Sequence, residues 1–217
     1  MPLVIDEPET NDRCEVINNT RATLVPWRSR CGGSMGQRIE FDDLAVLGDE
    51  LRRTGKRIVL TNGHFDLLHV GHLRSLQAAR RLGDVLVVAV NDDASTRRRK
   101  GPARPFVPAE ERAELLAGLA CVDYVTVFPD DTAERVIQLL RPHVYVKGGD
   151  YGVTPEELAS GKQPLPEAEL VRALGGEVVL IPYVPERSTT ELVRRILAAY
   201  GCAEVRDRLP SREEADR

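Results

Sequence analysis

The sequence predicts an α/β fold, a Rossmann-like doubly wound sheet of five parallel strands with helices on both faces. Short apolar runs alternate along the chain with segments whose apolar residues recur at helical spacing, which is typical of repeated βα units with right-handed crossovers. One run, residues 84–90, reads DVLVVAV. A continuously apolar strand is typical of a parallel sheet that is covered on both faces. The length of 217 residues suits one domain.

The first half of the predicted fold contains three helices and two strands. Apolar residues recur near helical spacing over 39–53 and 73–82, so both segments are expected to be helices. Apolar strands are predicted at 57–60 and 84–90, and a third helix at 110–119.

The second half of the fold is predicted to alternate strands and helices to its end. The strands lie at 124–128, 144–146 and 178–183, and the helices at 132–140, 167–174 and 189–199. Pro142 stops the first of these helices because proline lacks the backbone donor, and Gly175-Gly176 ends the second. Ligands of such sheets bind beyond the carboxyl ends of the strands, so chemistry is expected directly after each strand.

The chain divides into three parts by composition. Residues 1–34 show neither helical nor strand periodicity and are expected to be a disordered extension, with Met35 as a candidate true start. Residues 35–200 hold the periodic segments and form the predicted domain. Residues 201–217 are rich in charge and are expected to be a solvated tail.

Composition excludes several classes of protein. A hydrophobic fraction of 42% and a charged fraction of 29% are those of a globular protein, and a net charge of −4 gives no basic field for nucleic acid. No apolar run approaches the roughly 20 residues that span a bilayer, and the acidic N-terminus lacks a secretory signal. Four scattered cysteines without a CxxC pair are expected to be free thiols. We therefore expect a cytoplasmic protein.

The chemistry is expected to lie after the first strand, where the chain reads TNGHFDLLHVGH over 61–72. His69 and His72 are three residues apart at the start of a helix, so they share one face. Gly71 leaves room for a ligand, and the helix start offers free N–H groups to a phosphate. Two alternatives stay open: a chance pair of histidines, and a metal site that includes His64.

These residues resemble the cytidylyltransferase-like nucleotidyltransferases, and more closely the D-glycero-β-D-manno-heptose 1-phosphate adenylyltransferases. The second group includes the C-terminal domain of the bifunctional heptose kinase/adenylyltransferases. The resemblance runs from Gly36 to Leu197 and includes the segments TNGHFDLLHVGH, LGDVLVVAVNDDAS, KGPARP, ERAELLAGLACVDYV, VYVKGGDY and STTELVRRI. His64 departs from the family, whose members commonly carry cysteine there, and altered packing beside the nucleotide is expected.

The resemblance implies roles for particular residues. His69, His72 and Lys100 are implied as catalytic groups that contact the reacting phosphates. The implied nucleotide-binding residues are Thr61, Asn62, Gly63, His64, Phe65, Gly71, Lys147, Asp150, Ser188, Thr189 and Thr190. The implied substrate-binding residues are Asp66, Asn91, Asp93, Arg104 and Arg112. No residue is assigned as a metal ligand, and Mg²⁺ is expected to accompany ATP.

Some of these residues also have purely structural interpretations. Asp66 is as well suited to orienting its own loop as to contacting substrate. The run Arg97–Arg99 is typical of a solvated loop, and Ser188 is a typical helix N-cap.

The function implied is transfer of AMP from ATP to D-glycero-β-D-manno-heptose 1-phosphate, giving ADP-heptose and pyrophosphate. One alternative is cytidylyl transfer to glycerol 3-phosphate or a related phospho-alcohol, and another is a non-catalytic nucleotide-binding protein. The resemblance further implies a homodimer. A sugar kinase domain of the kind fused in bifunctional relatives is absent from the sequence, so a separate kinase is expected upstream.

Overall fold

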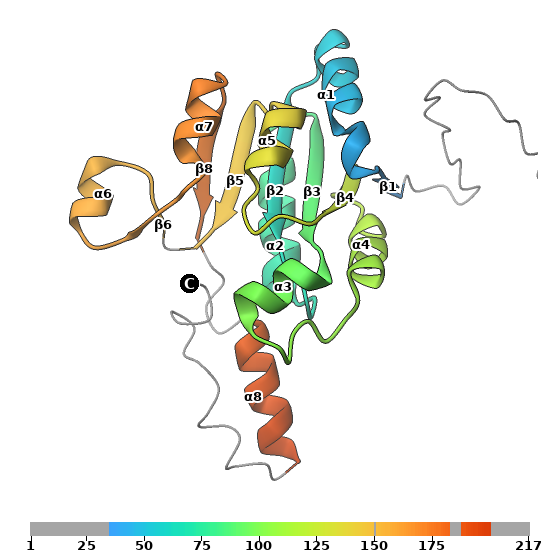
Figure 1. The fold of residues 1–217 in the computed structure, drawn as a ribbon, viewed down its shortest axis with the longest axis vertical. Helices are drawn as coiled ribbons and strands as arrows, with labels where there is room; N and C mark the ends of the chain where they lie inside the picture. The colour runs from blue at the N-terminus through green and yellow to red at the C-terminus, as the bar shows by residue number, and fades with distance from the viewer. Residues whose placement is uncertain (1–34, 150, 183–187, 201–217) are drawn as a thin grey trace, which may run out of the picture.

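A six-stranded parallel sheet forms the centre of the computed structural model, which describes residues 35–149, 151–182 and 188–200 (Figure 1). Its strands, in spatial order, are β1 (Gln37–Arg38), β4 (Tyr124–Phe128), β3 (Val85–Asn91), β2 (Ile58–Gly63), β5 (Val144–Gly148) and β8 (Glu177–Ile181). Every neighbouring pair is parallel. The strand order reverses between β2 and β5, which is where ligands of doubly wound sheets bind.

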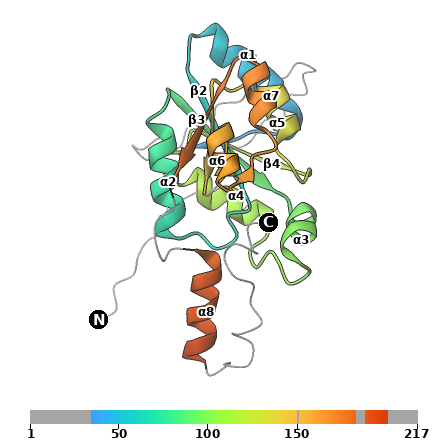
Figure 2. The same cartoon turned by 90° about the vertical axis from the view of Figure 1, so that its left-hand side faces the viewer.

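Helices cover both faces of this sheet (Figures 1 and 2). On one face, α1 (Leu44–Arg53), α5 (Glu134–Leu140) and α7 (Ala168–Ala173) pack over buried residues such as Leu60 and Val87. On the other, α2 (Val70–Arg80) and α4 (Ala109–Ala117) pack over Val59, Leu86 and Val88. Successive residues of one strand point to opposite faces, which is why the central strands read as unbroken apolar runs.

The predicted fold class is confirmed, but the predicted number of five strands is wrong. The additional strand is β1, which pairs only Gln37 and Arg38 with β4. Two residues are too short for any periodicity to reveal.

Short polar elements were also missed by sequence periodicity. The basic run that we expected to be a solvated loop lies in a helix, α3 (Asp93–Lys100), which begins at the N-cap Asp92 and ends at Gly101 with φ +94°. The remaining unpredicted elements are β6 (Tyr151–Gly152), α6 (Pro155–Ala159) and β7 (Gln163–Pro164), whereas the 3₁₀ helix η1 (Phe41–Asp43) begins the helical segment predicted over 39–53. Polarity hides all of these elements, because none presents an apolar stripe.

The last helix, α8 (Thr189–Ala199), begins near the sheet and extends away from it (Figures 1 and 2). Its predicted bounds are confirmed. None of the helices in the described ranges has the length and apolar character needed to cross a membrane. The expected extension over 1–34 and the expected tail over 201–217 lie outside the described residues.

Candidate active site

A cavity of about 290 Å³ lies at the carboxyl ends of the central strands. Most of the predicted site residues line it: Thr61, Asn62, Gly63, His64, Phe65, Asp66, His69, Gly71, His72, Asn91, Lys100, Arg104, Lys147, Ser188, Thr189 and Thr190. Asp93 and Arg112 do not belong to its lining, and Asp150 lies outside the described residues. The sheet thus brings together segments that are far apart in the sequence.

The β2–α2 loop fixes His69 at the N-cap of α2. Its Nδ1 accepts a hydrogen bond from the backbone N–H of Gly71 at 3.1 Å. An imidazole nitrogen that accepts carries no proton, so in the neutral ring the proton is on Nε2. His69 is therefore held as the tautomer with its N–H on Nε2.

His72 stacks on His69 one turn into the helix. The ring centroids are 3.8 Å apart with an interplanar angle of 21°, and Phe65 meets His72 edge to face at 5.3 Å. Burial, and secondarily the charge of His69, lowers the pKa of His72 to about 3. Its Nδ1 is buried and has no hydrogen-bond partner among the residues that the structure describes. His72 is thus a neutral imidazole at physiological pH.

The backbone of Phe65 is in the left-handed region, with φ +48°. A bulky residue rarely adopts this conformation, and such outliers occur preferentially where a site demands them. Phe65 is only 9% exposed and packs beneath the histidine pair. The strained turn therefore supports the position of His72.

Cationic side chains converge on the same cavity. Arg99, Lys100, Arg104 and Lys147 all line it. Burial and then the charges of Lys100, Lys147, Arg112 and Arg99 lower the pKa of His64 to about 3. A neutral, half-buried His64, whose Nδ1 lies 3.0 Å from Thr96 Oγ1, thus sits in a positive field that suits a polyphosphate.

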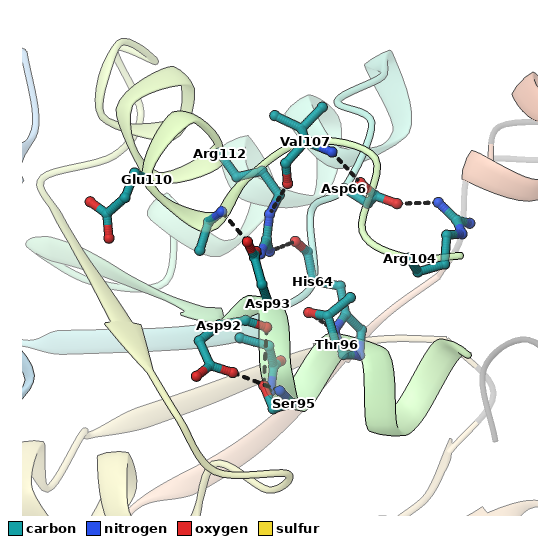
Figure 3. A network of polar contacts seen from close by, with 12 residues as sticks. His64, Asp66, Asp92, Asp93, Ser95, Thr96, Arg104, Val107, Glu110 and Arg112 are labelled. Carbon is teal, nitrogen blue, oxygen red and sulfur yellow. Dashed lines mark hydrogen bonds and ion pairs between the residues drawn. The ribbon is translucent and has the colours of Figure 1, made fainter. Parts of the chain in front are cut away.

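Asp66 binds the segment 104–107 (Figure 3). Its carboxylate is 6% exposed, accepts the backbone N–H groups of Phe106 at 2.7 Å and Val107 at 3.1 Å, and forms an ion pair with Arg104. The Arg104 guanidinium also lies 4.5 Å from the centre of the Phe106 ring. Of the two interpretations of Asp66, these contacts favour orientation of the loop.

Arg112 and Asp93, which do not line the cavity, form a second set of contacts (Figure 3). Arg112 is fully buried and donates to the backbone oxygens of Val107, at 2.8 Å, and of His64, and to Asp93 Oδ1 at 2.8 Å. The same Asp93 oxygen accepts the N–H of Ala109 at the start of α4. These groups have protein partners and support the loop, and their predicted contact with substrate stays a prediction.

Two further groups of predicted residues are held by specific contacts. Asn62 Oδ1 accepts from both the Tyr145 hydroxyl and Lys147 Nζ, each at 2.7 Å. Ser188 Oγ accepts the N–H of Glu191 at 3.1 Å, which makes it the N-cap of α8. Thr189 and Thr190 in the first turn of α8 line the cavity, so the helix cap and the site coincide.

Several residues at the cavity were not assigned to the site from the sequence. Thr132, Tyr145, Tyr151 and Glu167 are brought to the site or its immediate wall by the fold. Glu167 was predicted only as the start of a helix. A long-range backbone contact, Ala133 N–H to Glu167 Oε1 at 3.2 Å, positions it, and no local pattern encodes that contact.

Comparison with known proteins agrees with this arrangement. The model of the cytidylyltransferase-like family matches residues 60–196, and the chain belongs to that family. It is 51% identical over 75% of its length to the bifunctional protein HldE of Syntrophotalea carbinolica, and 50% identical over 72% of its length to the HldE of Streptomyces coelicolor. The matched regions are 33% and 32% of those two proteins, so the chain spans about a third of these relatives. The chain is thus a nucleotidyltransferase-family protein related to one part of HldE.

Members of this family typically use Mg²⁺. In the described ranges no group of three or more His, Cys, Asp or Glu side chains forms a metal cage. Two carboxylates that line the cavity are ion-paired, Asp66 with Arg104 and Asp131 with Arg98. Mg²⁺ commonly binds through substrate phosphates and water with few protein ligands. The residues therefore do not fit a metal held by the protein alone.

Proposed function

We propose that the protein transfers AMP from ATP to D-glycero-β-D-manno-heptose 1-phosphate, giving ADP-heptose and pyrophosphate. The stacked pair His69 and His72 at the cavity edge of α2 is the observation that carries this proposal. Identity of about half to the HldE relatives, over 69–75% of the chain, supports the choice of heptose 1-phosphate as acceptor.

The reaction is an in-line displacement at the α-phosphorus of ATP. An oxygen of the sugar 1-phosphate forms a new bond to that phosphorus, and the bond from phosphorus to the bridging oxygen breaks, so that pyrophosphate leaves with the electron pair. No covalent intermediate with the protein is needed. Catalysis then depends on positioning and on stabilisation of negative charge in the transition state.

The cavity residues supply donors for that charge. His69, whose Nδ1 accepts the Gly71 N–H, carries a proton on Nε2. Neutral imidazoles can donate to phosphate oxygens at physiological pH without first losing or gaining a proton. Lys100, Arg99 and Lys147 add positive charge around the same space. The hydroxyls and N–H groups at the start of α8 are suited to the outgoing phosphates.

We further propose that Mg²⁺ arrives with ATP, bound to its phosphates, where it neutralises charge on the leaving group. The pairing of Asp66 and Asp131 with arginine favours this arrangement. The homodimer also stays a proposal. The exposed apolar side chains of α8, with Ile196 at 47% and Tyr200 just beyond the helix at 82%, are candidates for burial by a second copy.

The proposed function is tested by product formation with heptose 1-phosphate, Mg²⁺ and ATP, CTP, GTP or UTP in turn. Pyrophosphate release and the mass of the nucleotide sugar are measured together, with His72→Ala as the control. ADP-heptose formed with ATP, and lost in the control, is the expected result. Turnover of CTP with glycerol 3-phosphate instead would move the protein to a different substrate within the family. Nucleotide binding without turnover would make it a binding protein.

A further inference from the structure

Glu167 is a buried carboxylate in the wall of the cavity. Its side chain precedes α7, is 4% exposed and lines the cavity together with Thr132 and Pro166. Oε1 accepts the backbone N–H of Ala133 at 3.2 Å, which holds the carboxylate in place. A charged group is rarely buried to this degree unless it is paired.

The second carboxylate oxygen lacks a donor. Oε2 is buried and accepts no hydrogen bond from any residue that the structure describes. Burial, followed by the charges of Glu167 and Tyr151 and the polar contact with the Glu167 carboxylate, raises the pKa of the neighbouring Tyr145 hydroxyl, so this group keeps its proton. Tyr145 has one proton, and Glu167 competes for it with Asn62 Oδ1, which accepts it at 2.7 Å. Leaving an ionised oxygen buried and unpaired costs free energy, and this cost is removed when a ligand supplies a donor.

The position of Glu167 distinguishes between the two substrates. The histidine pair lies on α2, and α2 covers the opposite face of the sheet from α7. The groups proposed for the nucleotide phosphates come from the starts of α2 and α8. The α7 side of the sheet edge therefore lies away from these phosphate-binding groups, which leaves it to the acceptor or to the ribose and base of the nucleotide.

The acceptor has suitable donors at that place. Phosphate oxygens are acceptors and a carboxylate repels them, whereas the hydroxyl groups of a sugar donate to a carboxylate. The neighbouring wall is polar. Asn91 Nδ2 donates to the backbone oxygen of Asp130 at 3.1 Å, and Thr132 precedes the Ala133 that holds Glu167.

We infer that Glu167 is a specificity-determining residue, and that its Oε2 accepts a hydrogen bond from a hydroxyl group of the acceptor sugar. The inference rests on the proposed function. It makes Glu167 a determinant of acceptor choice that the family motifs do not include.

The test compares Glu167→Gln with Glu169→Gln. Glutamine keeps the size of the side chain and an oxygen for the Ala133 N–H, but replaces the second carboxylate oxygen with an N–H donor. Glu169 lies on the exposed side of α7 and is the matched control. The Michaelis constants for heptose 1-phosphate and for ATP are measured separately, with kcat and the midpoint of thermal unfolding.

We expect Glu167→Gln to raise KM for heptose 1-phosphate by about tenfold or more, as is usual for loss of a hydrogen bond to a charged group. KM for ATP, the unfolding midpoint and the Glu169→Gln variant should stay near wild type. The preference of the protein for heptose 1-phosphate over glycerol 3-phosphate should shrink, because glycerol lacks the sugar ring. Glu167→Asp, which keeps the charge, should recover part of the affinity and is the second variant if Glu167→Gln does not fold.

Three results would overturn the inference. A rise in KM for ATP alone would assign Glu167 to the ribose or base. A lower unfolding midpoint with proportional changes in both Michaelis constants would leave it a structural cap of α5. Unchanged kinetics would leave it without a role in binding. If the wild-type protein does not turn over heptose 1-phosphate, the proposed function fails first and the inference falls with it. If the wild type is active and the variant is unaffected, the inference alone fails.

Discussion

The polar residues that line the cavity differ from those outside its lining in what they contact. In the lining, His69 and His72 stack on each other, and the buried Nδ1 of His72 has no hydrogen-bond partner among the described residues. Outside the lining, Asp93 and Arg112, which we call the support pair, are bound to each other and to the protein backbone. The role of a polar motif residue thus depends on whether the protein or the cavity takes up its hydrogen bonds. Residue type alone does not show which.

The largest expected difference between the two regions is in turnover. His72→Ala should lower turnover by about 10²–10³, the usual effect of removing one donor that stabilises transition-state charge. The matched control is His143→Ala. His143 Nδ1 accepts the backbone N–H of Ile58 at the opposite end of the strands, so its removal should leave turnover within about threefold, the range of one weak neutral hydrogen bond. Pyrophosphate release measures both variants. Loss of less than tenfold in His72→Ala would place the chemistry elsewhere in the cavity.

The support pair should instead act through stability. Arg112→Leu removes a fully buried guanidinium, so that the backbone oxygens of His64 and Val107 lose a donor and the half-buried Asp93 keeps only the Ala109 N–H. Loss of these hydrogen bonds should cost about 3 kcal/mol of unfolding free energy, at the lower end for a broken buried pair. Urea unfolding measures this loss. In the fraction that stays folded, KM for both substrates should be near wild type. A variant of normal stability with a raised KM for the sugar phosphate would make Arg112 a substrate contact after all.

The pH dependence of stability tests the two cavity histidines whose pKa values are lowered, His64 and His72. His64 and His72 have pKa values lowered to about 3 in the folded protein, against 6.5 as the ordinary value. Between pH 6.5 and pH 3 the unfolded chain therefore binds more protons, so the free energy of unfolding falls as pH falls through this range. The slope is about 1.4 kcal/mol per pH unit for each such histidine.

Urea titrations at pH 7, 6 and 5 test this slope. Carboxylates titrate in the lower part of the range, so the informative quantity is the difference between wild type and His64→Asn. The variant, which keeps one of the two histidines, should lose stability less steeply. Equal slopes in both proteins would mean that His64 is protonated in the folded state.

The sequence predicts the regular parts of the molecule better than its polar contacts. The central strands and the loop over 61–72 were predictable, because burial on two faces and the two histidines leave local patterns. The contacts of Arg112 were not predictable, because its three acceptors belong to residues 64, 93 and 107, which only the fold brings together. Glu167 was missed for the same reason. Helix α3 was missed because its basic side chains hide the helix that Asp92 caps.

The smallest expected effect tests whether a helix cap also serves the site. Ser188 and Thr154 are both N-caps, each accepting an N–H three residues ahead, at 3.1 Å and 3.3 Å. Substitution of either by alanine should cost about 1 kcal/mol of helix or protein stability. Thr154 begins α6, away from the lining of the cavity, whereas Ser188 lines it. Only Ser188→Ala should therefore also raise KM for ATP, by about threefold to tenfold, as expected for one lost neutral hydrogen bond. Equal KM values in the two variants would show that the start of α8 contributes structure without binding phosphate. Phosphate binding would then be left to the cations and the histidine pair.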